Sequence, residues 1–298
     1  ELSFPFIISS FSLIGFSLSY LFVTILQGRQ KFLFAALAES SIIFFKVLLT
    51  GMLLLSGRLN FNSILFIFSL SSFVGFLIGL PFISLRFLSA KGDITLLKTL
   101  FNFGIWVALA RIANAASGRI DSLMLVRFVE ASQIGFYTAA QRVTFIFPLL
   151  VGGVSVVLSP KFSSLKDPDE AKSFMIKSSL LMSSLFFLVL LLFVFAPWLV
   201  VVAYGEIYQP AVFILRILLV SSFFFIASSI PTTVLLYYLG ESKIFTLISI
   251  FQLVLIFLGD LILIPRVGVL GPAVSLSIAY AVVFFLSLLF VFQRFREK

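Results

Sequence analysis

The sequence of 298 residues contains no cysteine and no histidine, and charged residues make up only 11% of it. Without cysteine it can form neither a disulfide framework nor a thiolate metal site, and it has no cysteine nucleophile. Without histidine it lacks the commonest general base and metal ligand of proteins. We therefore expect a protein that is not an enzyme and that uses neither a cofactor nor a metal.

Long apolar segments dominate the chain. Hydrophobic residues make up 61% of it, and phenylalanine alone accounts for 40 residues. Runs long enough to cross a bilayer, about 20 residues each, recur along the whole length. The predicted spans are 4–26, 32–56, 62–86, 99–125, 133–157, 175–203, 209–238, 244–264 and 268–292. Because only helices satisfy their own backbone in lipid, this pattern predicts an all-α polytopic membrane protein with about nine transmembrane helices.

Basic residues between the spans predict the orientation of the helices. If the N-terminus lies outside, one face of the membrane collects Arg29, Lys31, Arg86, Lys91, Lys98, Lys161, Lys166, Lys172, Lys177, Lys243, Arg294, Arg296 and Lys298. The loops on the other face carry Arg58 and Arg266. Since basic loops stay in the cytoplasm, we expect a cytoplasmic C-terminus. The net charge of +9 is dispersed over short loops, which favours membrane lipids as partners over nucleic acid.

A short glycine-containing segment occurs twice, and it suggests an internal repeat. Residues 26–32 and 239–245 each follow one apolar span and precede another, and the spans after Gly28 and Gly240 correspond in length. The predicted domains are a six-helix lobe at 91–298 and a partial N-terminal lobe at 1–90, equivalent to the last three helices of six. Parallel repeats of this kind are common in transporters, with the substrate path between them. We therefore expect a piece of a longer protein.

Three cations lie near the middle of predicted spans. At a rise of ~1.5 Å per residue, Lys46 is about 21 Å, Arg111 about 18 Å and Arg142 about 14 Å from the start of its helix. A cation at that depth costs several kcal/mol unless it faces partners or water. Guanidinium groups suit phosphate oxygens, so these cations either bind an anionic substrate or pair with buried acids and carbonyls. Asn114 and Arg119 are candidate residues of the cavity wall.

Glu39, Asp121 and Asp260 are the acidic residues in or near predicted spans. Protonation of one of them could couple transport to a proton or sodium gradient. Glu39 and Lys46 share a helix face but are too far apart for direct contact. Arg119 and Asp121 are two positions apart and point to different sides, so Asp121 meets either another helix or the external headgroups.

Several motifs, in order from about residue 26 to 292, resemble those of a known family. They are RIDSLML at 119–125, GFYTAA at 135–140, SPKFS at 159–163, YGEIY at 204–208 and LIPRVGVLGPA at 263–273. They resemble the polysaccharide (O-antigen, Wzx-type) flippases of the multidrug/oligosaccharidyl-lipid/polysaccharide exporter superfamily. Val126 and Glu130 depart from the family pattern, which usually has glycine and a small residue at these positions.

The resemblance implies a two-lobed exporter fold in the inner cell membrane. It also implies alternating access that flips an undecaprenyl-pyrophosphate-linked oligosaccharide from the cytoplasmic to the periplasmic leaflet. Arg111, Arg142 and Lys46 would then bind the pyrophosphate, with the lipid-linked oligosaccharide as substrate. The polysaccharide polymerase and export machinery would be further partners.

Two other functions compete with the flippase. A multidrug or small-solute cation-coupled antiporter of the same superfamily is the nearer alternative, but cations at the midplane argue against cationic substrates. A membrane glycosyltransferase or polymerase usually needs a sizeable soluble loop. The longest polar loop here, near 159–174, is short, and Asp167 beside Pro168 is typical of a helix cap.

The predicted topology is directly testable. Green fluorescent protein fused after Lys298 should fluoresce, because the basic loops hold the C-terminus in the cytoplasm. Alkaline phosphatase at the same position should stay inactive, while a fusion in the loop that carries Arg58 should be active. The reverse pattern would contradict the orientation.

Overall fold

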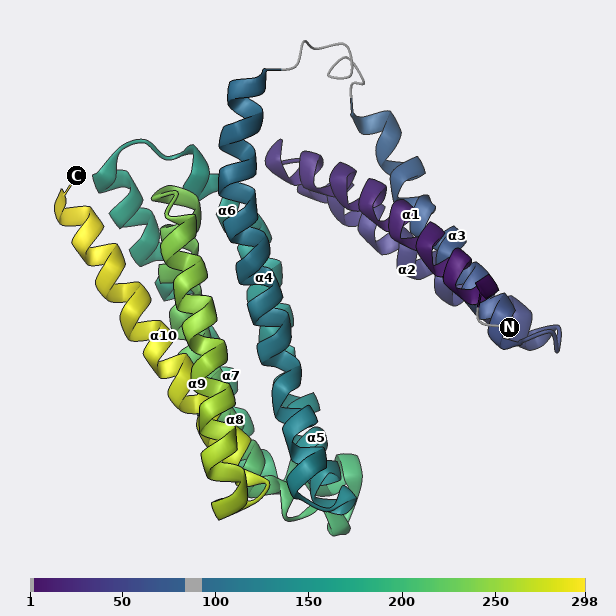
Figure 1. The fold of residues 1–298 in the computed structure, drawn as a ribbon, viewed down its shortest axis with the longest axis vertical. Coiled ribbons are helices and arrows are strands. Elements are labelled where there is room, and N and C mark those ends of the chain that lie inside the picture. The colour runs from purple at the N-terminus through teal and green to yellow at the C-terminus, as the bar shows by residue number, and fades with distance from the viewer. Residues whose placement is uncertain (1–2, 84–92, 298) are drawn as a thin grey trace. The chain divides into compact units, whose positions relative to one another are not determined.

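The computed structural model of the protein describes residues 3–83 and 93–297, and every regular element in these ranges is a helix (Figure 1). The chain divides into two compact units, Glu1–Gly92 and Asp93–Lys298. The predicted lobe boundary at 90/91 and the end of the predicted third span, 84–86, lie outside the described residues.

The first unit is a bundle of long helices. Its elements are α1 (Ser3–Gly28), α2 (Phe32–Leu55), α3 (Phe61–Gly79) and the 3-10 turn η1 (Leu80–Phe82). α3 packs against both α1 and α2. The buried Ser19 hydroxyl on α1 donates to the Ser72 carbonyl of α3 at 2.6 Å and accepts the Phe76 amide at 2.8 Å. Polar groups thus join the helices where lipid offers no competing partner.

The second unit is a larger bundle built around α8. Its elements are α4 (Ile94–Phe128), α5 (Ala131–Thr144), α6 (Ile146–Ser164), α7 (Pro168–Tyr204), η3 (Glu206–Tyr208), α8 (Ala211–Thr233), η4 (Val234–Tyr238), α9 (Ser242–Val267) and α10 (Leu270–Glu297). α8 packs against α5, α7 and α10, while α9 packs against both α4 and α10. The Glu170 amide donates to Asp167 Oδ2 at 3.2 Å, which confirms that Asp167 caps α7.

Nine segments of the described chain are helical, long and apolar enough to cross a membrane. This confirms the predicted all-α, polytopic membrane class and the number of spans. One of the nine, residues 131–164, consists of α5 and α6 together.

The predicted fifth span, 133–157, is broken at Phe145, where α5 has ended and α6 begins. Pro148 explains the break, because it has no amide to donate to the Thr144 carbonyl four residues earlier and its ring crowds that turn. Within the first turn of α6 the proline is tolerated, since the first amides of a helix have no partner inside it. The last turn of α5 therefore lies inside the span.

α8 does not stop at Thr233 but continues as the π-helical turn η4. In that turn the Leu239 amide donates to the Val234 carbonyl, five residues earlier, at 3.0 Å. Pro231 lies just before it and removes one amide from the α-helical ladder. The turn forms the C-terminal end of this helix, just before Gly240, where turns of this kind commonly occur.

α9 and α10 approach each other closely at Gly259. A Cβ atom at this position would lie 2.7 Å from Ser275 Oγ and 3.0 Å from Ser275 Cβ. Small residues permit such close approach in membranes, where packing rather than the hydrophobic effect holds helices together. The contact fixes the neighbouring residue on α9, Asp260, against α10.

Gly259→Ala should therefore destabilise the protein by about 1–3 kcal/mol, because Ser275 has to move. Thermal unfolding of the detergent-solubilised protein, followed by circular dichroism, measures the change. Gly104→Ala is the matched control, because a Cβ atom there meets nothing within 4 Å. Equal unfolding midpoints for the two variants would contradict the tight contact.

Candidate functional site

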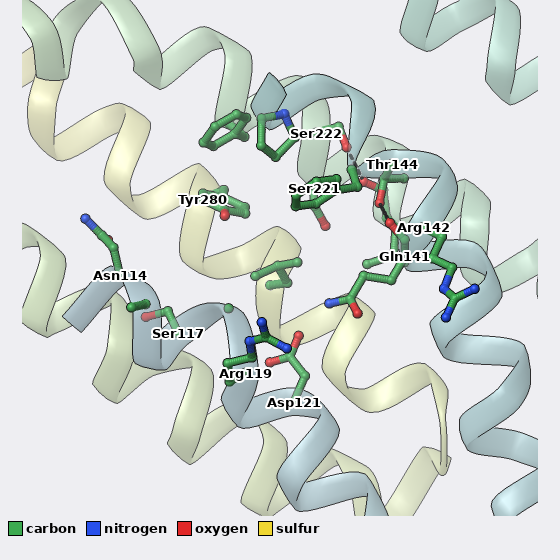
Figure 2. Close-up of a pocket in the computed structure, with 17 residues that line it drawn as sticks. Asn114, Ser117, Arg119, Asp121, Gln141, Arg142, Thr144, Ser221, Ser222 and Tyr280 are labelled. Atoms are coloured by element: carbon green, nitrogen blue, oxygen red, sulfur yellow. Dashed lines mark hydrogen bonds between the residues drawn. The ribbon is translucent and has the colours of Figure 1, made fainter. Parts of the chain in front are cut away.

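The second unit encloses a cavity of about 440 Å³ between α4, α5, α8 and α10, with the α5–α6 break at its edge (Figure 2). Its volume lies within the ~300–1,000 Å³ of small-molecule sites. Its lining is unusual for a membrane bundle, because charged, amide and hydroxyl side chains from several helices converge on it.

One wall of the cavity is a polar stripe on α4. Asn114, Ser117 and Asp121 are three and four positions apart, so they lie along one helix face. Asn114 Nδ2 donates to Ser249 Oγ of α9 at 3.4 Å, and Ser117 is buried. Arg119 also lines the cavity but is exposed, whereas Asp121 is buried. α4 thus presents a cation and an acid to the same space.

The last turn of α5 forms the second polar wall. Gln141, Arg142 and Thr144 line the cavity there, next to Phe145 and Pro148. Pro148 lies just after this turn, where it removes one amide from the helical ladder. Arg142 is exposed, and Figure 2 shows it on this wall, with Arg119 on the wall formed by α4.

The two cavity arginines form no ion pair with an acid that the structure describes. The salt bridges of the described residues join Lys161 to Glu170, Lys172 to Asp169 and Arg294 to Glu241, so neither Arg119 nor Arg142 takes part in one. The positive charges of these two arginines are therefore not neutralised by a salt bridge to any acid among the described residues.

Arg216 shows the contrasting case of an arginine used in packing. Its Nε donates to the Phe193 carbonyl at 3.4 Å, and its guanidinium lies 5.4 Å from the centre of the Phe193 ring. Its contacts lie within the bundle, with α7, rather than in the cavity. Such contacts stabilise helix packing.

The wall formed by α8 and α10 is neutral and hydroxyl-rich. Ser221 Oγ lies 2.7 Å from Ser277 Oγ of α10, and the Ser222 hydroxyl donates to the Leu218 carbonyl at 2.8 Å. Tyr280 of α10 completes this wall. The charges of the cavity therefore come from α4 and α5.

Two buried carboxyl groups lie together at the α4 wall. Asp121 is 1% exposed and Asp260, on α9, is 0% exposed, and the two side chains lie beside each other. The Tyr137 hydroxyl of α5 donates to Asp121 Oδ2 at 2.6 Å. Asp121 Oδ1 and both carboxyl oxygens of Asp260 form no hydrogen bond of ordinary geometry with described residues. Like charges so placed repel each other strongly if both groups are ionised.

The structure groups some of the predicted site residues. Arg142, Arg119, Asn114 and Asp121 line one cavity, and Asp121 meets α5 and α9 rather than external headgroups. Arg111 lies on an exposed face of α4, and it is not among the cavity residues. Its predicted pairing with Arg142 at one phosphate site is therefore not seen in this cavity, and its role stays a prediction.

The candidates of the first unit lie in α2. Lys46 is half-buried, with Nζ 4.7 Å from the centre of the Phe68 ring of α3. Glu39 is exposed, and neither residue forms a salt bridge with a described residue. The cation–π contact holds Lys46 within its own bundle, and both predicted roles stay predictions.

Sequence reasoning missed Tyr137, Gln141 and Tyr280. An aromatic residue near a span end is typical of the interfacial belt, whereas Tyr137 is wholly buried against Asp121. The signal that could have found it is the spacing of Tyr137, Gln141 and Thr144, which are four and three positions apart and so lie along one helix face. For Tyr280 the sequence offers no comparable pattern.

Solved structures of transporters share this fold. The outward-facing conformation of a multidrug resistance MATE family transporter of the MOP superfamily matches with a TM-score of 0.81 and 16% identity, over 94% of this chain and 66% of its own. The MATE transporter VcmN of Vibrio cholerae in its bent form matches with a TM-score of 0.81 and 15% identity, over 99% and 70%. The chain is thus a polytopic membrane protein with a MATE-like transporter fold.

Sequence comparison gives the family. A family described as "Polysaccharide biosynthesis protein" matches residues 1–213, and the chain belongs to it. This confirms the predicted family of polysaccharide flippases.

Two curated relatives add to this. A putative O-antigen transporter of Shigella flexneri is 31% identical over 183 residues, which cover 61% of this chain and 44% of that protein. An uncharacterized membrane protein of Methanocaldococcus jannaschii is 28% identical over 276 residues, which cover 87% of this chain and 65% of that protein. The chain therefore spans less than two thirds of the length of these relatives.

The bond between Tyr137 and Asp121 should matter for stability. Tyr137→Phe removes the described donor to a buried carboxyl group and should destabilise the protein by about 1–3 kcal/mol. Thermal unfolding compares it with Tyr204→Phe, which keeps the ring contact with Tyr208. Asp121→Ala removes the acceptor of this bond, so it should cost much less in the Tyr137→Phe background than alone. Strict additivity of the two changes would contradict a coupled pair.

Proposed function

We propose that the chain is part of a membrane transporter that flips an undecaprenyl-pyrophosphate-linked oligosaccharide from the cytoplasmic to the periplasmic leaflet by alternating access. The observation that carries this proposal is the cavity inside the membrane-spanning bundle, where Arg119 and Arg142 have no acidic partner among the described residues. Cations that lack an acidic partner within a membrane-spanning bundle are costly unless they serve a ligand or a water-filled path.

The chemistry of the cavity suits a phosphate group with sugar attached. Two guanidinium groups offer paired, permanently charged donors for phosphate oxygens. Asn114, Gln141 and Tyr280 supply amide and hydroxyl groups of the kind that bind sugar hydroxyls. A volume of about 440 Å³ is enough for the phosphate-bearing end of the substrate rather than the whole oligosaccharide.

The family supports the same substrate class. The chain belongs to a family described as polysaccharide biosynthesis proteins, and its Shigella flexneri relative is named a putative O-antigen transporter. The inner membrane is then the natural location. Polysaccharide polymerase and export machinery are the natural partners, because they would receive the flipped product.

A cation-coupled multidrug or small-solute antiporter is the second candidate. The MATE-like fold and the buried acids Asp121 and Asp260 favour it. The two candidates differ in the charge of the substrate. An anionic substrate needs the arginines, whereas a cationic drug needs the acids and is repelled by the arginines.

Arginine variants test the proposal. Arg119→Gln and Arg142→Gln should each lower flipping of a fluorescent polyprenyl-pyrophosphate oligosaccharide in proteoliposomes by about 10- to 100-fold, because each removes a charged hydrogen bond to phosphate. Arg142→Lys should recover only part of the activity, since it keeps the charge but loses the paired donors.

Arg216→Gln is the control, because Arg216 lies outside the cavity and its side chain donates to the Phe193 carbonyl on α7. It should leave flipping close to the parent rate. Full activity of both cavity variants would contradict the phosphate site. Export of ethidium by the parent protein, combined with no flipping of the lipid-linked oligosaccharide, would favour the antiporter.

A further inference from the structure

The cavity brings unpaired positive charge close to one member of a buried acid pair. Arg119 and Asp121 are two residues apart on α4, and both line the cavity. Asp260 lies beside Asp121 from α9. A ligand held by the arginines is therefore a close neighbour of the carboxyl pair. In a poorly solvated bundle, charges so placed influence each other far more than they do in water.

The groups around the acid pair come from every helix packed on it. α8 contributes leucine, serine and phenylalanine to the cavity but no titratable side chain. The Ser275 hydroxyl approaches Asp260 from α10. The charged and titratable groups that line the cavity are Arg119 and Asp121 of α4, Arg142 of α5 and Tyr280 of α10. Behind the cavity wall, Tyr137 of α5 and Asp260 of α9 neighbour Asp121.

Hydrogen bonding defines which atoms can take a proton. Asp121 Oδ2 is occupied as the acceptor of the Tyr137 hydroxyl. Asp121 Oδ1 and the two oxygens of Asp260 are buried, and no described donor satisfies them with ordinary geometry. One proton between the facing carboxyl groups would convert two repelling charges into a single charge with a hydrogen bond.

We infer that the pair formed by Asp121 and Asp260 takes up a proton when an anionic ligand binds in the cavity, so that proton and ligand stabilise each other's binding. This inference rests on the proposed function, since it needs an anion at Arg119 and Arg142. The proton comes from solution on binding and returns to it when the ligand leaves. By thermodynamic linkage, a lower pH then raises the affinity for the anion, and the anion raises the affinity for the proton by the same factor.

The sign of this coupling separates the two candidate functions. An anion is repelled by an ionised carboxyl pair, so protonation helps it to bind. A cationic drug is attracted by the same ionised pair, so protonation expels it. A proton on the acid pair thus strengthens the binding of an anion and weakens the binding of a cation. The pH dependence of binding an anionic probe therefore shows whether the cavity couples proton and anion in this way.

The test is binding of farnesyl pyrophosphate to the protein in phosphatidylcholine nanodiscs, in sodium-free potassium buffers. From about pH 6 to about pH 8, the affinity of the parent for farnesyl pyrophosphate should fall. This fall should exceed the fall in Asp121→Asn or Asp260→Asn by a factor of about five or more, which is within the usual range of coupling between two sites. The probe's own phosphate titrates equally in all samples, so the difference between parent and variant isolates the acid pair. The side-chain amide introduced by Asp121→Asn keeps an oxygen that can accept the Tyr137 hydrogen bond, so this variant stays close to the parent fold.

Calorimetry supplies a second measurement that needs no variant. Binding enthalpies in buffers of different ionisation enthalpy give the protons exchanged, and we expect net uptake of up to one proton per probe beyond that taken by the probe itself. Equal pH dependence in parent and variants, or no net uptake by the parent, would overturn the inference. Recovery of the affinity at high pH by sodium chloride would also overturn it, because a metal ion would then occupy the pair.

Failure of the proposed function gives a different result. Absence of probe binding at every pH, or binding unaffected by Arg142→Gln, contradicts the phosphate site itself and the inference with it. Probe binding that depends on Arg142 but not on pH supports the phosphate site and contradicts only the proposed proton uptake by the acid pair.

Discussion

The hydrogen bond from Tyr137 to Asp121 is the contact around which the second unit's polar interior is organised. A carboxyl group that is 1% exposed within an apolar bundle needs a partner, and the phenol of α5 supplies one at 2.6 Å. The bond fixes α5 to α4, while Asp260 brings α9 to the same point. One position earlier on α9, Gly259 allows a close approach to Ser275 of α10. Helix positions and polar chemistry are therefore set by the same few side chains.

The second feature that shapes the cavity region is a proline within the helix rather than a polar contact. Pro148 cannot donate an amide to the turn before it, so the helix through this span is interrupted at Phe145. The last turn of α5, with Gln141 and Arg142, lines the cavity directly before this interruption. Polar side chains thus reach the cavity from within an apolar span, without any polar loop.

Local pattern in the sequence predicts some features well and others not at all. The spans follow from apolar runs, and the capping role of Asp167 follows from its place before Pro168. Depth along a helix singles out both Arg111 and Arg142, but depth says nothing of rotation about the helix axis. The assembled bundle has Arg119, rather than Arg111, in the cavity wall, which position along the sequence did not predict. Asp121 and Asp260 are distant in sequence, so their proximity is visible only once the bundle is assembled.

The π-helical turn after Thr233 closes the C-terminal end of the central helix with its own backbone. The Leu239 amide donates to the Val234 carbonyl five residues earlier, and the Glu241 amide donates to the Leu235 carbonyl six residues earlier. Carbonyl groups that would otherwise be left without a partner at the end of a helix are thereby satisfied without any polar side chain. The end of α8 can therefore lie among apolar residues, and the serines of this helix remain available to the cavity wall.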